Sequence, residues 1–123
     1  MTLLLVIAGG LIGAPLRYLT DLLVQARHDS VFPWGTFAVN VIGSLVLGLV
    51  LGAAASGAVP ASFVAFVGTG ICGALTTFST FGFETVRLLE GGSMLAAATT
   101  ALGSLAAGLA AGSVGWALVT ALA

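Results

Sequence analysis

Electrical charge is scarce in this sequence. Its 123 residues include three basic and four acidic side chains, and every basic one is an arginine. Charged residues make up 6% of the chain, whereas a soluble domain carries roughly 25%. A nucleic-acid-binding protein needs a basic surface to neutralise phosphates, so we expect no nucleic-acid partner. A soluble domain with a charged surface is equally disfavoured.

Cysteine and histidine occur once each. Cys72 has no partner for an intrachain disulfide, and its apolar neighbours are typical of a small packing residue. His28 lies in a predicted loop, and no second histidine is available to build a metal site with it. Because His, Cys and carboxylate residues form no convergent set, an enzyme is the least favoured class. No basic segment precedes the first apolar run, so we expect no cleavable signal peptide.

Apolar residues dominate instead, at 59% of the chain with a mean hydropathy of +1.23. A helix needs about 20 residues to cross a hydrocarbon core about 30 Å thick. Four predominantly apolar stretches are long enough, at about residues 2–26, 34–55, 61–88 and 94–122. The sequence therefore predicts an all-α membrane protein with four transmembrane helices. We expect these to form one transmembrane domain over residues 1–123, in contact with membrane lipid.

The third stretch contains a polar segment at residues 73–81. Its hydroxyl residues are Thr76, Thr77, Ser79 and Thr80, and its aromatic residues are Phe78 and Phe81. Glycines at 68, 70 and 73 weaken the helix ahead of this segment. We predict a broken third helix, with one half over about 62–73 and the other from about Phe78. Such backbone persists at membrane depth only inside protein or beside a cavity, where it can face ions, so it marks a candidate site.

Arg17 is unexpected in the first stretch. Only about fourteen apolar residues precede it, which is ~21 Å of helix and too short to cross the core. Arg17 then lies inside the span or in a wet vestibule, where Asp21 can pair with it one turn later. Alternatively, Arg17 extends to the interface beside Tyr18. Both interpretations stay open.

Polar and small residues recur every fourth position in the second and fourth stretches. They are Thr36, Asn40, Ser44, Gly48 and Gly52, and then Thr100, Ser104, Gly108, Gly112 and Trp116. Asn40 can form an interhelical hydrogen bond worth ~1 kcal/mol, or it can offer amide donors to an anion on a pathway. The sequence slightly favours the packing role. Thr100 and Ser104 are the better pathway candidates in the fourth stretch.

The distribution of arginine gives almost no signal for membrane orientation. With four spans, both termini and the second loop share a side without Arg or Lys, while Arg27 and Arg87 lie on the other. So weak a bias allows insertion in both orientations. Four short helices also enclose little space, so we predict a dimer.

Three motifs resemble the CrcB/Fluc fluoride-channel family. They are GGLIGAPLRY at residues 9–18, GTFAVNVIG at 35–43 and GICGALTTFSTF at 70–81. Their order and spacing fit over essentially the whole chain, and the third motif is the most specific. Family members often have glycine where Ala74 stands, and the fourth stretch has little motif.

The resemblance implies an antiparallel, dual-topology homodimer with two pores that export fluoride passively across the bacterial inner membrane. It implies that Asn40 lines the pore and that Phe78 and Phe81 meet the anion through their ring edges. It also implies a structural sodium ion at the dimer interface, held by the backbone carbonyls of Gly73 and Thr76. Arg17 matches the family's membrane-embedded arginine. We add Thr77, Ser79, Thr80 and Ser104 as candidate pore residues, because hydroxyl groups can replace water around fluoride.

Two other functions remain open. A small proton-coupled multidrug-type transporter is also a four-span dimer, but it needs a carboxylate deep in the membrane. Asp21 lies near the end of its span beside Arg17, and Glu84 is expected near a membrane surface. A purely structural helix bundle would use Asn40 and the aromatic residues for packing alone.

Overall fold

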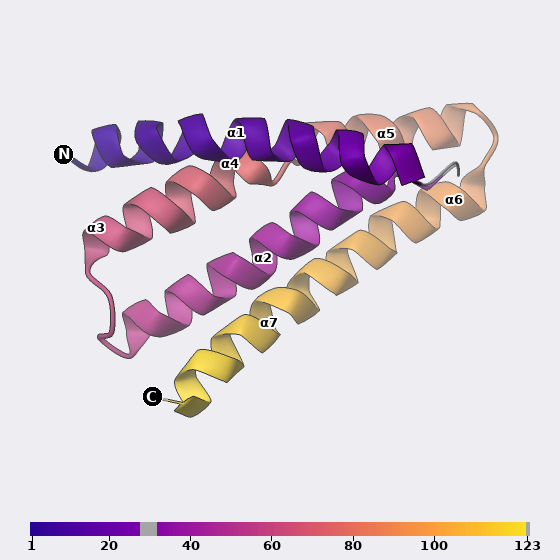
Figure 1. The fold of residues 1–123 in the computed structure, drawn as a ribbon. Helices are drawn as coiled ribbons and strands as arrows, with labels where there is room; N and C mark the ends of the chain where they lie inside the picture. Colours follow the sequence, from indigo (N-terminus) through magenta and orange to yellow (C-terminus); the bar gives the residue numbers. More distant parts are fainter. Residues whose placement is uncertain (28–31, 123) are drawn as a thin grey trace.

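The computed structural model describes residues 1–27 and 32–122 (Figure 1). His28 lies outside this part of the chain. All regular structure within the described ranges is helical. Four helical segments are long and apolar enough to cross a membrane, over Thr2–Arg27, Trp34–Ala55, Ala61–Glu90 and Met94–Leu122. The predicted all-α, multi-pass membrane protein is confirmed at this level.

Two of the spans are continuous α-helices and two change their helical geometry along their length. The first span is α1 (Thr2–Arg27) and the second is α2 (Trp34–Ala55). The third consists of α3 (Ala61–Phe63), the π-helical η1 (Val64–Cys72), α4 (Gly73–Leu75) and α5 (Ser79–Glu90). The fourth consists of α6 (Met94–Ala98), the π-helical η2 (Thr99–Gly103) and α7 (Ser104–Leu122).

The helices pack in two close pairs, α1 against η1 and α4, and α2 against α7 (Figure 1). Glycine permits both approaches. A Cβ atom added to Gly9 would overlap the Phe66 carbonyl oxygen and lie 2.8 Å from the Gly70 Cα, and one added to Gly48 would overlap the Gly112 carbonyl. Small residues that let backbones approach are the usual basis of helix association in membranes.

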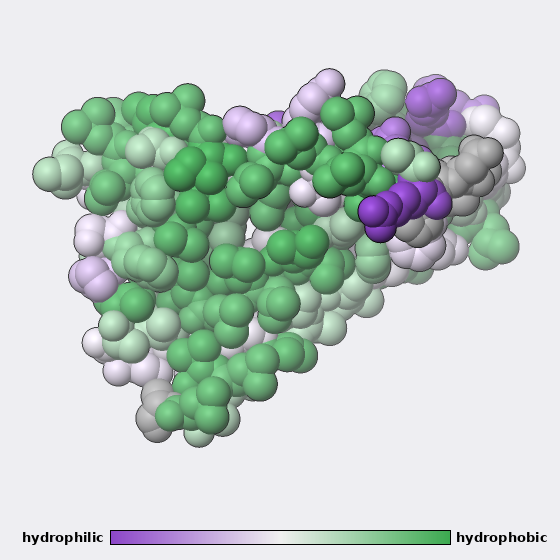
Figure 2. Space-filling model, in the orientation of Figure 1, coloured by the Kyte–Doolittle hydropathy of each residue, from purple (hydrophilic) through white to green (hydrophobic). Residues whose placement is uncertain are grey.

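The two ends of the molecule differ in polarity. Figure 1 shows both termini at the same end as the turn between α2 and α3, with the turn between α5 and α6 at the other. Figure 2 shows an apolar surface over most of this face, with hydrophilic residues gathered towards the α5–α6 end. Large apolar side chains such as Leu4 and Leu11 are exposed, as expected for a surface that contacts lipid.

Regular helix stops between α4 and α5. The Thr76 N–H and the Thr76 hydroxyl both donate to the Cys72 carbonyl, at 3.0 and 2.8 Å. Thr76 itself has extended backbone angles, with φ −78° and ψ 158°. Helical geometry resumes at Ser79. The polar segment noted in the sequence therefore contains the interruption of regular helix.

Candidate functional site

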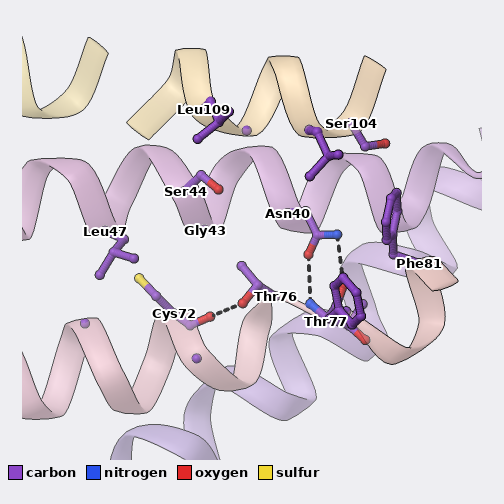
Figure 3. Close-up of a pocket in the computed structure, with 15 residues that line it drawn as sticks. Asn40, Gly43, Ser44, Leu47, Cys72, Thr76, Thr77, Phe81, Ser104 and Leu109 are labelled. Carbon is purple, nitrogen blue, oxygen red and sulfur yellow. Dashed lines mark hydrogen bonds between the residues drawn. The ribbon is translucent and has the colours of Figure 1, made fainter. Parts of the chain in front are cut away.

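A groove of about 400 Å³ lies beside the interruption of the third span (Figure 3). Its walls come from α2, the third span and α7. None of the fifteen residues that line this groove is charged. They are Asn40, Gly43, Ser44, Leu47, Gly68, Cys72, Gly73, Thr76, Thr77, Phe78, Phe81, Ser104, Leu105, Gly108 and Leu109.

Asn40 connects α2 to the interruption through both halves of its amide. Its Nδ2 donates to the Thr77 carbonyl at 3.0 Å, and its Oδ1 accepts the Thr77 N–H at 2.7 Å (Figure 3). In a continuing helix, the Thr77 N–H would instead donate to the Gly73 carbonyl. Asn40 thus replaces a helical partner where regular helix stops.

Thr77 connects this contact to the start of α5. Its side chain is 8% exposed. Its Oγ1 accepts the Thr80 N–H at 3.2 Å and lies 3.4 Å from the Ser79 Oγ. A hydroxyl that accepts an N–H three residues ahead satisfies one of the free donors of a helix start. Thr77 therefore both ends the interruption and stabilises the first turn of α5.

Phe78 and Phe81 bring two aromatic rings to the groove. Their ring centroids are 5.9 Å apart and the ring planes are inclined by 47°. Phe78 is 81% exposed although it lies in the middle of an apolar span. The edge of a phenyl ring carries partial positive charge, so exposed ring edges are chemically able to face an anion.

A second cavity of about 210 Å³ lies next to the first, and Thr77 lines both. Its lining residues are Ala14, Arg17, Tyr18, Asp21, Gly35, Thr36, Val39, Thr77 and Thr80. Arg17 is half-buried there and its Nη1 donates to the Thr76 carbonyl at 3.5 Å. Asp21 accepts a hydrogen bond from Gln25 at 2.9 Å. Arg17 and Asp21 thus hydrogen-bond to different partners.

Thr36 and Glu84 form a contact that the sequence did not single out. The Thr36 hydroxyl donates to a carboxylate oxygen of Glu84. Thr36 is 5% exposed and lies in the first turn of α2, which places Glu84 near the end of that helix. The four-residue polar stripe contained Thr36, but nothing in the local pattern indicated its partner, which lies 48 residues away.

The candidate site residues are divided between the two cavities. The groove is lined by Asn40, Thr77, Phe78, Phe81 and Ser104, together with Gly73 and Thr76. Thr80 and Arg17 line the second cavity. Ser79 is not among the lining residues of either cavity. Ser44 and Cys72 also line the groove, although they were not candidates.

Known proteins similar to this chain match it over most of its length. A protein from Streptomyces avermitilis named "Fluoride-specific ion channel FluC 1" is 59% identical over 115 residues, covering 94% of this chain and 93% of that protein. One from Frankia casuarinae with the same name is 58% identical, covering 99% and 98%. "Fluoride-specific ion channel FluC" from Methanocaldococcus jannaschii is 47% identical, covering 73% and 71%. Residues 4–116 match the family model described as "CrcB-like protein, Camphor Resistance (CrcB)". The chain belongs to the CrcB-like protein family.

Proposed function

We propose that this protein is a fluoride-selective channel that lets fluoride leave the cell passively. The observation that carries the proposal is the uncharged groove in which an amide, several hydroxyl groups and two aromatic rings converge beside the interrupted span. The names of the relatives from Streptomyces avermitilis and Frankia casuarinae support the same ion. The four apolar spans support a location in a membrane, which we infer to be the bacterial inner membrane.

The chemistry of the groove suits a small anion. Fluoride is strongly hydrated, so a pathway has to replace its water with hydrogen-bond donors. The hydroxyl groups of Thr77 and Ser104, and the Asn40 N–H that is not bonded to Thr77, are such donors. The Thr76 hydroxyl already donates to the Cys72 carbonyl. A full positive charge would hold the ion too tightly, because conduction needs sites weak enough to release it. We assign Arg17 to the adjoining cavity, where it favours entry of anions.

We propose that the working unit is an antiparallel homodimer of chains inserted in opposite orientations. The exposed Phe78 ring and the groove beside it support a second chain that covers them. A wall of this kind would enclose the path, and it would bury the interrupted backbone that lipid cannot satisfy. In this arrangement the third span is a broken helix whose interruption lies between the two chains. The absence of Arg and Lys near the termini and in the second loop is compatible with dual topology.

The implied sodium ion fits the residues present. Because the Thr77 N–H donates to Asn40, the Gly73 carbonyl loses its usual helical partner at the end of α4. Helix C-termini and freed carbonyl oxygens suit a hard cation. The Thr76 carbonyl already faces the Arg17 guanidinium, and it has a second lone pair. We propose that Gly73 and Thr76 from both chains hold sodium, which would supply fixed positive charge at the interface.

The decisive experiment measures fluoride efflux from liposomes with a fluoride electrode, with chloride efflux as the matched control. We expect fast fluoride efflux and negligible chloride efflux, without an imposed proton gradient. Comparable chloride efflux would refute selectivity. Fluoride efflux that requires a proton gradient would favour the transporter alternative, which needs a titrating carboxylate. Crosslinking in detergent that finds only monomer with activity intact would refute the dimer.

A further inference from the structure

The Asn40 amide is largely occupied by protein backbone rather than free for an ion. A side-chain amide has one carbonyl oxygen and two N–H donors. The oxygen accepts the Thr77 N–H at 2.7 Å and one N–H donates to the Thr77 carbonyl at 3.0 Å. One donor therefore remains. Both contacts are shorter than the 3.5 Å contact between Arg17 and Thr76, which also connects another helix to the interruption.

Thr77 connects α2 to the start of α5, because it contacts Asn40 on α2 and Thr80 on α5. Its own side chain accepts the Thr80 N–H in the first turn of α5. The residue after it is Phe78, and Phe81 follows one turn later on α5. The Thr77 backbone is the link between these rings and α2. If Thr77 moves, both rings and the start of α5 move with it.

We propose that Asn40 is a positioning residue: it clamps Thr77 to α2 and thereby holds the Phe78 and Phe81 rings in place along the groove. This role deepens the proposed function, since it assumes that the groove is the anion path. It differs from the role of a simple anion ligand. A ligand acts only when fluoride is present, whereas the clamp exists before any ion enters.

The first test is hydrogen exchange of the Thr77 amide, measured by NMR in detergent and in fluoride-free buffer. Asn40→Ala removes both bonds, so we expect the Thr77 amide to exchange at least about tenfold faster. Asn40→Asp keeps the oxygen that accepts the Thr77 N–H but loses the donor to the Thr77 carbonyl, so we expect a smaller rise in exchange than in Asn40→Ala. Ser44→Ala, one turn along the same face of α2, should leave exchange at Thr77 unchanged. Because no fluoride is present, this result is independent of whether the protein conducts fluoride.

The second test is a double-mutant cycle on fluoride efflux. Phe78→Ile removes one of the two rings that the clamp is proposed to hold. If Asn40 acts by holding this ring, the double variant should be no more than about twofold slower than the slower single variant, because the two changes share one mechanism. The pair Ser44→Ala and Phe78→Ile should multiply their effects.

Two results would overturn the clamp. One is unchanged exchange at Thr77 in a folded Asn40→Ala protein, and the other is a cycle in which the two fold-changes multiply. Either would make Asn40 an anion ligand only. If Asn40→Ala does not fold, Asn40→Asp decides the matter, because it removes the donor to the Thr77 carbonyl: faster exchange at Thr77 than in the unmodified protein supports the clamp, and unchanged exchange contradicts it. Absence of fluoride efflux in the unmodified protein would refute the proposed function while leaving the exchange result valid.

Discussion

Phe78 is far more exposed than the residue that precedes it. It exposes 81% of its side chain, yet it lies next to Thr77, which is 8% exposed. We expect Phe78→Ile to slow fluoride efflux by about tenfold, equivalent to ~1.4 kcal/mol, because isoleucine has no positively polarised ring edge. Phe83→Ile is the control: Phe83 is also exposed on α5, at 66%, but it does not line the groove. Equal slowing by both variants would remove Phe78 from the path.

The hydrogen bond between Thr36 and Glu84 connects α2 to α5. Thr36→Val removes the donor while keeping the side-chain shape, which leaves the Glu84 carboxylate without this partner. We expect unfolding in detergent to become easier by about 1–3 kcal/mol. Glu84→Gln keeps an acceptor oxygen and should lose less than about 1 kcal/mol. Thermal unfolding of both variants measures this, and a greater loss in Glu84→Gln would mean that the negative charge matters more than the hydrogen bond.

The hydrogen bonds that Asn40 and Thr36 form with distant residues could not be predicted from the sequence. The periodic pattern put Asn40 and Thr36 on one face of a helix, which is a local property of the chain. Their partners lie 37 and 48 residues away. Those pairings depend on how α2 is rotated against the third span, and no local pattern encodes that rotation. The interhelical role favoured for Asn40 could be suggested, but its target could not.

At the scale of elements, glycine positions determine how closely α1 approaches the third span. A Cβ on Gly9 would overlap the Phe66 carbonyl, whereas the nearest atom to one on Gly10 is the Ala74 Cβ at 3.9 Å. We expect Gly9→Ala to destabilise the protein by about 1–3 kcal/mol through overpacking. Gly10→Ala should be neutral or stabilising by up to about 1 kcal/mol, because alanine favours helix. Melting temperatures in detergent compare the pair, and equal shifts would show that α1 does not pack in this way.

Some helical elements could be predicted from local composition and others could not. The four spans could be predicted because length and hydropathy are properties of each stretch. The polar segment at 73–81 indicated a change in the third span, and Thr76 has extended backbone angles there. No sequence pattern indicated that Val64–Cys72 and Thr99–Gly103 are π-helical. Both segments consist of apolar residues, glycine and threonine that also occur in the α-helices around them, so the residue types do not distinguish them.

At the scale of the whole molecule, the groove extends beyond the interruption of the third span. The groove beside the third span shares Ser44, Leu47, Gly108 and Leu109 with a third cavity of about 420 Å³ between α2 and α7. Together they form a continuous hollow along the molecule. A second copy that fills this hollow would bury apolar surface while leaving the polar groups beside Thr77 for the ion. The proposed dimer therefore accounts for both the hollow and its polar end.

Orientation in the membrane provides the last prediction. Ser56→Lys with Ala58→Lys adds positive charge to the turn between α2 and α3, which biases that turn towards the cytoplasm. Glu90→Lys with Gly91→Lys applies the opposite bias at the α5–α6 turn. We expect each double variant alone to give little fluoride efflux from cells, because an antiparallel dimer needs both orientations. Coexpression of the two should restore efflux, measured with a fluoride electrode. Full efflux from either variant alone would show that a parallel assembly or a single chain conducts the ion.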